Sequence, residues 1–286
     1  MSSIFGDDLS NTKQKETCKD VVLNSGLNDK QRKQPKQLVE EFKDIFSDVP
    51  RMTHIVEHKV KLTHDEPIKF KPYPVPYKMQ EVVDKEIADM LAMGIIEPSD
   101  APYASLLVLV KKPDGTFQVC VNFKDLNKIT VFDSEPMMSA NNIFPKLPGS
   151  KFHSTFDFSK GYGTIPMEEK SKKYTTFVST RGLMRFKVMP FGMVNSGSTY
   201  KRNIRKLLNG RENLESYVDD ILGHSQQWDF HLKILRDFVN SVGNANLLLK
   251  SSKCKILFGE IEFPGHNLQG DSIGPQDKSV GHILKT

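Results

Sequence analysis

The sequence is poor in cysteine and has no long apolar run, and each absence excludes whole classes of protein. Its three cysteines are far apart and form no CxxC pair, which argues against a disulfide framework and a zinc knuckle. No apolar stretch approaches the roughly 20 residues of a membrane span, and the first residues lack the basic and apolar regions of a signal peptide. We therefore expect three free thiols, no membrane partner, and a location in the cytoplasm or nucleus.

A strong charge of either sign is also absent. Forty Lys and Arg residues face 35 Asp and Glu residues, and the net charge of +5 permits a polyanionic partner without requiring one. A length of 286 residues with 38% hydrophobic and 26% charged residues is ordinary for a globular protein of one large domain or two lobes. Net charge and composition therefore do not indicate a function, and only local groups of residues can.

Hydrophobic periodicity predicts a mixed chain of the α+β class. Residues 1–37 are polar and rich in Lys, Gln and Asn, so we expect a flexible N-terminal segment. Residues 38–60 are expected to hold a lead-in helix that stops near Pro50 and the start of a strand over 55–62. Further helices are predicted over 79–91, 198–210 and 228–242, and further strands over 105–110, 117–123, 152–158, 254–258 and 261–263.

Two adjacent acids, Asp219 and Asp220, follow Tyr217 and precede a short apolar run. Because Asp is depleted in strands and enriched in tight turns, residues 217–222 are expected to form a hairpin whose tip presents both carboxylates. Two close carboxylates repel each other, and a divalent cation is one way to keep both ionised. For these residues alone, an exposed Asp-Asp turn is the alternative. A metal site requires further acids from elsewhere in the chain.

A third acid stands on a separate predicted strand. Phe152, Phe156 and Phe158 fall on one face of this strand, so Asp157 falls on the opposite face. Asp157 is therefore a candidate partner for the paired acids.

The predicted helix over 198–210 has a basic surface. Its apolar stripe leaves the remaining surface to four cationic side chains, Lys201, Arg202, Arg205 and Lys206. Such a surface either follows a phosphate backbone or is an ordinary solvated helix face.

A different enzyme class is suggested by one short motif. His54, Glu57 and His58 formally match the H-x-x-E-H pattern of inverted zinc peptidases, in which the motif lies on a helix and the glutamate is the base. The flanking residues alternate like a strand, and no second helix supplies an obvious third ligand. The strand-like alternation and the lack of a third ligand therefore disfavour the zinc-peptidase interpretation.

Several sequence blocks occur in a fixed order along the chain. They are FSDVP at 46–50, GIIEPS at 94–99, LVKKPDG at 109–115, CVNFKDLNK at 120–128, FDFSKGY at 156–162, VMPFG at 188–192, YVDDIL at 217–222, KC at 253–254 and FPGH at 263–266. Together they resemble the reverse transcriptase of Ty3/gypsy-type LTR retrotransposons over about residues 38–280. The resemblance implies a fragment of a Pol polyprotein with the fold of a right-hand polymerase, with fingers and palm present and the thumb largely missing. It places the fingers at 61–131 and 165–189, the palm at 132–164 and 190–268, and the start of the thumb or connection at 269–286.

This resemblance implies an RNA-directed DNA polymerase, a nucleotidyltransferase that extends a primer on an RNA or DNA template with deoxynucleoside triphosphates. Asp157, Asp219 and Asp220 match the catalytic and metal-site acids of the family. In the family's scheme, Asp157 and Asp219 ligate two Mg²⁺ ions, for which Mn²⁺ is a substitute, while Asp220 adds negative field and positions the hairpin. The oligomeric state stays open.

The resemblance also implies residues that contact the nucleotide and the nucleic acid. Lys111 and Lys112 would reach the triphosphate, and Tyr162 would lie under the sugar, where its ring blocks a 2′-hydroxyl. The remaining matches are Phe191 and Gly192 beside the nucleotide and Tyr217, Val218 and the basic helix beside the nucleic acid.

Gln118 departs from the family pattern. It stands where the family usually has an arginine, and a neutral amide cannot replace a bidentate, charge-assisted contact with the triphosphate. Asn122 likewise replaces a usual aspartate. The alternative hypothesis is therefore a truncated, catalytically weak relic that binds nucleic acid without polymerising.

Overall fold

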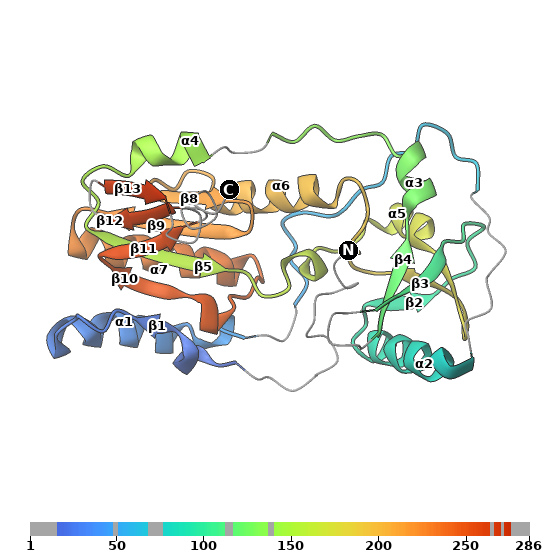
Figure 1. Ribbon diagram of the computed structural model, residues 1–286, viewed down its shortest axis with the longest axis horizontal. Coiled ribbons are helices and arrows are strands. Elements are labelled where there is room, and N and C mark those ends of the chain that lie inside the picture. Colours follow the sequence, from blue (N-terminus) through green and yellow to red (C-terminus); the bar gives the residue numbers. More distant parts are fainter. Residues whose placement is uncertain are drawn as a thin grey trace, which may run out of the picture. The chain divides into compact units, whose positions relative to one another are not determined.

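The fold of the chain is shown as a computed structural model in Figure 1. The structure describes residues 16–47, 51–67, 77–111, 117–136, 140–263, 266–269 and 272–275. The chain divides into two compact units. The first unit comprises the described parts of residues 52–135 and 160–202, and the second comprises the described parts of residues 14–51, 136–159 and 203–286. No helix within the described ranges is both long enough and apolar enough to cross a membrane.

The second unit is built on a five-stranded sheet in the order β1-β10-β5-β9-β8. Its strands are β1 (Val22–Leu23), β10 (Lys255–Phe258), β5 (Phe152–Asp157), β9 (Asp220–Ser225) and β8 (Leu214–Tyr217). The β1–β10 pair is parallel and the other pairs are antiparallel. Predicted strands over 152–158 and 254–258 and the predicted hairpin over 217–222 are therefore confirmed. Figure 1 shows β5 and β9 side by side, which brings two candidate acid-bearing segments together.

Each face of this sheet is covered by a different layer. On one face lies helix α7 (Trp228–Asn244), where Phe238 packs against Phe156 with ring centroids 4.6 Å apart. Leu222 points to the other face because successive side chains of a strand alternate. There it joins a buried cluster of Ile143, Leu147, Leu222, Ile261, Phe263 and Leu268. The cluster joins the sheet to α4 (Ala140–Ile143) and to a small sheet of β11 (Glu260–Phe263), β12 (His266–Gln269) and β13 (Ser272–Pro275).

The expectation of a flexible segment over residues 1–37 is wrong for its described part, residues 16–37. Helix α1 (Asp29–Glu41) begins at an Asn28 capping box and buries Pro35 and Leu38. The preceding 3₁₀ helix η1 (Cys18–Asp20) has its own capping box at Thr17, and β1 adds an edge to the sheet. Hydrophobic periodicity did not predict these elements, because their stability comes from caps and from pairing with a distant strand and not from a continuous apolar stripe.

The predicted lead-in over residues 38–60 is also corrected. Helix α1 ends at Glu41 and is followed by the 3₁₀ helix η2 (Lys43–Ile45). Residues 55–62 form no strand, although Val56, His58 and Val60 are buried in alternation as a strand would bury them. Within the described residues, the strand-type pairs that this segment forms are isolated bridges, His58 to Met167 and Leu62 to Thr130. The alternation of buried and exposed side chains was predicted correctly, but too few consecutive backbone pairs form for a β-strand.

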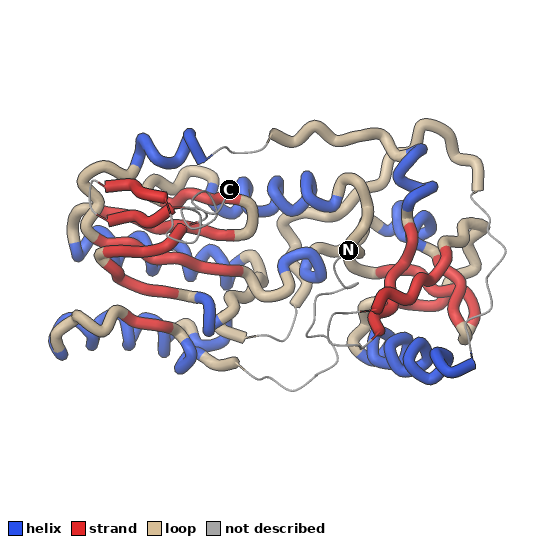
Figure 2. The backbone as a smooth tube through the Cα atoms, viewed as in Figure 1, coloured by secondary structure: helices blue, strands red, loops and turns tan. Residues whose placement is uncertain are grey.

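The first unit holds two small sheets and several helices. Its helices are α2 (Tyr77–Ala92), α3 (Lys124–Ile129), α5 (Glu169–Lys172) and the beginning of α6 (Ser196–Leu208), with the 3₁₀ turns η4 (Gly161–Thr164) and η5 (Lys173–Thr175). One sheet has the order β2 (Ile96–Pro98), β7 (Gly182–Phe186), β6 (Phe177–Ser179), and the other pairs β3 (Leu106–Lys111) with β4 (Phe117–Asn122). Figure 2 colours the helices blue and the strands red. The mixed α+β class is confirmed.

Local sequence explains several of these elements. Helix α2 ends as predicted, because Gly94 adopts φ +66° and lets the Ile95 amide donate to the Met90 carbonyl at 2.9 Å. Phe186 is fully buried, with Phe177 and Phe123 packed around it at centroid distances of 5.3 and 6.2 Å. This aromatic group forms part of the core of the first unit.

Candidate active site

The β8–β9 hairpin carries two of the three candidate acids. Strand β8 ends at Tyr217 and β9 begins at Asp220, so the turn consists of Val218 and Asp219. Val218 adopts φ +56°, a left-handed conformation that is strained for a β-branched residue. This turn leaves Asp219 exposed at the tip and makes Asp220 the first residue of β9. The predicted hairpin is confirmed, with only one of its two acids in the turn itself.

The third acid lies directly across the sheet from the hairpin. Asp157 is the last residue of β5 and is the register partner of Asp220 on β9. Its side chain is only 16% exposed. Like charges directly opposite each other on antiparallel strands destabilise a sheet. The arrangement therefore calls for positive charge at this position.

Lys253 supplies one such charge. Its ammonium Nζ lies 2.5 Å from Oδ2 of Asp157. The hydrogen bond to Asp157 raises the pKa of Lys253 and so favours its charged form. Partial loss of hydration beside the neighbouring acids and the negative charge of Asp157 raise the pKa of both the half-buried Asp220 and the more exposed Asp219, while Lys253 opposes this effect. One cation thus faces three carboxyl groups, and two of these carboxyls are already harder to ionise than usual.

The backbone around Lys253 is attached to the strand that carries Asp157. Lys253 ends the 3₁₀ helix η6 (Ser251–Lys253), and the Lys250 amide donates to the Asp157 carbonyl at 2.9 Å. Next to it, Cys254 is fully buried, and burial raises its thiol pKa to about 12. No role for Lys253 could be predicted from the sequence, because nothing local indicates that it contacts an acid 96 residues earlier.

The three acids offer a suitable ligand set for a divalent cation. Their donors are all carboxylate oxygens, which hard cations prefer. Partial loss of hydration and the negative charge of Asp157 both raise the pKa values of Asp219 and Asp220. As the side chains stand in the described ranges, no three His, Cys, Asp or Glu residues are gathered into a metal-binding group. The three acids thus suit a divalent ion by the chemistry of their oxygen donors. In this structure, however, Asp157 is paired with Lys253.

The zinc-peptidase interpretation is contradicted by the local structure. The motif residues do not lie on a helix, and His54 is exposed while His58 is buried. His58 instead contacts Thr199, with Nδ1 and Oγ1 2.8 Å apart, and burial lowers its pKa to about 4. The two histidines therefore do not share one face as zinc ligands would.

Three of the predicted nucleotide-binding residues come together within the first unit. Tyr162 lies in η4, and its ring centroid is 4.7 Å from that of Phe191. Gly192 follows with φ +87°, and its carbonyl accepts a 2.7 Å hydrogen bond from Asn127 Nδ2. The Tyr162 ring also stacks on Tyr200, which lies on helix α6 and for which the sequence predicted no functional role.

The predicted triphosphate contacts are only partly described. Lys111 is the exposed last residue of β3, whereas Lys112 lies outside the described residues. Gln118 belongs to β4 and pairs with Val110, but its side chain is not among the described ones. The roles of these residues therefore stay predictions.

The basic surface of α6 is not uniform. Arg202 is held in a structural ion pair, with its guanidinium 2.7 Å from Asp133 and 3.1 Å from Glu135. Arg205 and Lys206 are exposed, and Lys201 is half-buried. Arg202 is thus already engaged by two acids, which weakens its assignment as a phosphate contact.

The remaining predicted nucleic-acid residues lie on the hairpin. Tyr217 packs against Phe263 with ring centroids 6.4 Å apart, and Val218 is 52% exposed. Tyr217 therefore anchors the hairpin, while Val218 is available at its tip.

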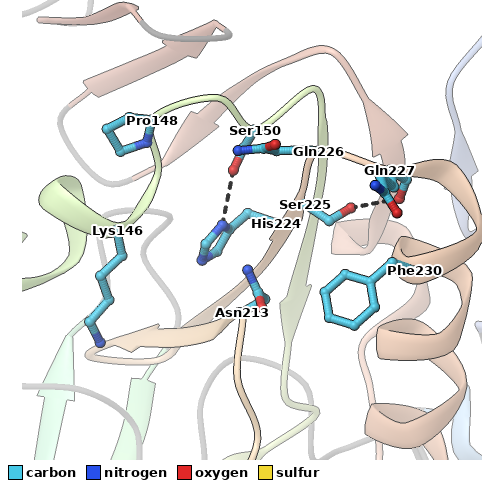
Figure 3. A pocket seen from close by; sticks show the side chains of 9 residues that line it. All are labelled: Lys146, Pro148, Ser150, Asn213, His224, Ser225, Gln226, Gln227 and Phe230. Carbon is cyan, nitrogen blue, oxygen red and sulfur yellow. Dashed lines mark hydrogen bonds between the residues drawn. The ribbon is translucent and has the colours of Figure 1, made fainter.

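A cavity of about 250 Å³ lies at the end of β9 opposite to Asp220. Figure 3 shows its lining side chains, Lys146, Pro148, Ser150, Asn213, His224, Ser225, Gln226, Gln227 and Phe230. His224 is buried and its Nδ1 lies 3.0 Å from Ser150 Oγ, as the dashed line shows. Its Nε2 has no hydrogen-bond partner within the described structure. None of the candidate acids lines this cavity.

Comparisons with known proteins identify the family of this chain. The model of the family described as reverse transcriptase (RNA-dependent DNA polymerase) matches residues 110–268, more than half of the chain. The retrovirus-related Pol polyprotein from transposon 297 of Drosophila melanogaster is 32% identical over 239 residues, covering 81% of this chain and 23% of that protein. The transposon Tf2-3 polyprotein of Schizosaccharomyces pombe is 26% identical over 256 residues, covering 87% of this chain and 19% of that protein. The chain thus spans less than a quarter of the length of these curated relatives.

Solved structures show the same fold. A foamy viral protease-reverse transcriptase in complex with an RNA/DNA hybrid matches with a TM-score of 0.78 and 21% identity, over 91% of this chain and 36% of that chain. A second foamy viral structure, in complex with double-stranded DNA, matches with a TM-score of 0.79 and 21% identity, over 91% of this chain and 47% of that chain. The predicted polymerase fold is therefore confirmed. The chain belongs to the reverse transcriptase (RNA-dependent DNA polymerase) family, and its relatives are retrotransposon Pol polyproteins.

Proposed function

We propose that this chain is the polymerase domain of a retrotransposon Pol protein and extends the 3′ end of a primer along an RNA or DNA template. The observation that carries the proposal is the placement of three carboxyl groups at one end of a rigid sheet. Asp157 and Asp220 are register partners on β5 and β9, and Asp219 stands beside them in the turn. Functional groups on paired strands are held more firmly than groups on loops.

Reverse transcriptases use divalent metal ions, and for this chain we propose two Mg²⁺ ions held by Asp157 and Asp219, with Mn²⁺ as a substitute. When bound, the ions activate the primer hydroxyl and stabilise the charge of the triphosphate. Asp220 adds negative charge and fixes the start of β9. Lys253 orients the Asp157 carboxylate through its 2.5 Å contact.

The nucleotide is proposed to be a deoxynucleoside triphosphate. We assign its sugar to Tyr162, with Phe191 and Gly192 beside it, and its phosphates to Lys111 and Lys112. A tyrosine ring under the sugar leaves no room for a 2′-hydroxyl, the atom that separates ribonucleotides from deoxyribonucleotides. The packing of Tyr162 against Phe191 at 4.7 Å supports this assignment, because a packed ring resists displacement.

The division into fingers and palm is part of the same proposal. We assign residues 61–131 and 165–189 to the fingers, 132–164 and 190–268 to the palm, and 269–286 to the start of the thumb or connection. The two compact units support this division in outline, because one holds most of the proposed fingers and the other most of the proposed palm. Residues 132–135, 160–164 and 190–202 cluster with the first unit, so the proposed palm is not a single compact unit.

A duplex of template and primer is the proposed partner. Both foamy viral structures contain such nucleic acids, an RNA/DNA hybrid in one and double-stranded DNA in the other. On this chain we assign the duplex to the exposed Val218, with Tyr217 beneath it, and to the basic side chains Lys201, Arg205 and Lys206. Charged contacts of this kind make binding depend on salt concentration.

Primer extension on an RNA template tests the proposal. Asp219→Asn should abolish extension that depends on Mg²⁺ or Mn²⁺, while Asp229→Asn, which removes the same charge from the exposed start of α7, should leave it unchanged. Complete absence of metal-dependent product from the parent protein would contradict a polymerase. Gln118 favours the alternative, a relic that binds nucleic acid without polymerising, and salt-dependent template binding without extension would support it.

A further inference from the structure

The ring of Tyr162 rests on a second tyrosine to which the family resemblance assigned no role. Tyr200, on helix α6, stacks on Tyr162 with ring centroids 5.0 Å apart and ring planes only 6° from parallel. Tyr200 is 3% exposed, so its ring is part of the packed interior of the first unit. The Tyr162 ring is therefore supported by a buried ring on a long helix.

Gly161, next to Tyr162 in the chain, leaves the space that the Tyr200 ring occupies. A Cβ atom on Gly161 would lie 2.5 Å from Cε2 and 2.9 Å from the hydroxyl oxygen of Tyr200, distances that real Cβ atoms do not show. Only a glycine allows Tyr200 to approach so closely at this position. A Cβ on Gly197 would lie 3.8 Å from the Tyr162 hydroxyl oxygen, an ordinary contact that requires no glycine.

The turn that carries Tyr162 offers little rigidity of its own. It is a single 3₁₀ turn of four residues, Gly161–Thr164, entered through Lys160 at φ +50°. Its internal side-chain support is the 2.7 Å hydrogen bond from Thr164 Oγ1 to the Gly161 carbonyl. A short turn of this kind does not by itself fix the χ angles of a half-buried tyrosine, so ring contacts from outside the turn must do so.

We infer that Tyr200 is a positioning residue that holds the Tyr162 ring at the depth and angle needed to reject ribonucleoside triphosphates. This inference rests on the proposed function, in which Tyr162 lies under the sugar of the incoming nucleotide. Rejecting one additional oxygen atom requires a wall that does not yield when the larger sugar presses on it. Tyr200 supplies that resistance through face-to-face packing, and Gly161 makes the packing geometrically allowed.

The test compares kcat/KM for a deoxynucleoside triphosphate with that for the matching ribonucleoside triphosphate in single-nucleotide primer extension. Tyr200→Leu should lower this ratio by about fivefold, and Tyr200→Phe should keep it, because the phenyl ring preserves the stack. Gly161→Ala should lower the ratio as well, because the new methyl group displaces the Tyr200 ring. The ratio is informative because a general loss of folded or active protein affects both nucleotides equally.

Tyr103→Leu is the matched control. Tyr103 is also 3% exposed, belongs to the same unit and packs edge-on against Tyr174 with centroids 5.0 Å apart. Its replacement should lower the melting temperature and total activity without changing the ratio. A second control is Tyr162→Val, which should lower the ratio more than Tyr200→Leu does. Adding Tyr200→Leu to Tyr162→Val should then cause no further loss, since the supported ring is gone.

The outcomes separate this inference from the proposed function. Wild-type protein that extends primers, combined with an unchanged ratio in both Tyr200→Leu and Gly161→Ala, would overturn the role of Tyr200 alone. Wild-type protein that incorporates no deoxynucleotide would overturn the proposed function and this role with it. If Tyr200→Leu does not fold, Gly161→Ala still decides the question, because it leaves both tyrosines in the chain.

Discussion

Asp157 and Asp220 face each other as register partners across antiparallel strands β5 and β9, in a position where two negative charges weaken the sheet. The Lys253 ammonium, 2.5 Å from Asp157, offsets part of this repulsion. Repulsion between these acids lowers the stability of the fold but favours the binding of cations.

Asp220→Asn should stabilise the protein in the absence of divalent ions. The pKa of Asp220 is raised in the folded state by burial and by Asp157, so its charged form is disfavoured there and a neutral isostere removes that penalty. We expect the free energy of unfolding to rise by about 0.5–1 kcal/mol at pH 7. Urea denaturation measures it, and Asp229→Asn on α7 should give no comparable gain. A loss of stability in Asp220→Asn would contradict repulsion at this pair.

Lys253→Met should have the opposite effect. Removing the ammonium leaves the three carboxyl groups without their neighbouring cation, and we expect a loss of about 0.5–1 kcal/mol, kept small because the lysine is 57% exposed. Adding Mg²⁺ should narrow the difference from wild type, because an ion that binds the native state stabilises it. Denaturation with and without Mg²⁺ measures both effects. Lys233→Met, at an exposed position of α7, should change neither.

Two of the buried histidines of the second unit, His224 and His231, should make stability fall in mild acid. Burial lowers the pKa of His224 to about 4 and that of His231 to about 3, from an ordinary value of 6.5. Below pH 6.5 the unfolded chain therefore takes up two protons that the folded chain refuses. The free energy of unfolding should be steady above pH 7 and fall by up to about 2.7 kcal/mol per pH unit between pH 6.5 and 4.

Urea denaturation at several pH values measures this slope. His231→Gln should be less stable at pH 7.5, because His231 contacts Ser154 and Ser225 at 2.8 and 3.0 Å, but its stability should decline less steeply in acid. His54→Gln is the control, since His54 is exposed. Equal slopes for wild type and His231→Gln would show that His231 does not stay neutral in the folded protein.

Val218→Gly should stabilise the hairpin turn. Val218 adopts φ +56°, where a β-branched side chain is strained and glycine is not, so we expect a gain of about 0.5–1 kcal/mol after the flexibility of glycine in the unfolded chain is deducted. The melting temperature should rise. Asn213→Gly, at φ +63°, is the comparison, because asparagine already tolerates this conformation and should gain little. A fall in the melting temperature of Val218→Gly would contradict strain at the turn.

The elements that sequence analysis predicted correctly share one property. In α2, the apolar stripe and the closing Gly94 both lie within one short stretch, so the helix and its end could be read locally. The hairpin over 217–222 was equally local, since its turn and the two short strands that it joins lie within one stretch of the chain. Strand β1 was missed because it has two residues, and Asn24 beyond it bonds to Leu257, which lies 233 residues further along the chain. No local pattern records such a partner.

By itself, the sequence singled out Asp157, Asp219 and Asp220 as candidate site acids, because they stand in recognisable blocks whose strand and turn character is encoded nearby. Only the tertiary structure decided that Asp157 faces Asp220 in register and that Lys253 neutralises it. It alone also showed that Asp133 and Glu135 engage Arg202 and that Tyr200 supports Tyr162. The physical reason is that strand register, ion pairing and ring stacking depend on which distant segments pack together, whereas periodicity reports only the segment in which it occurs.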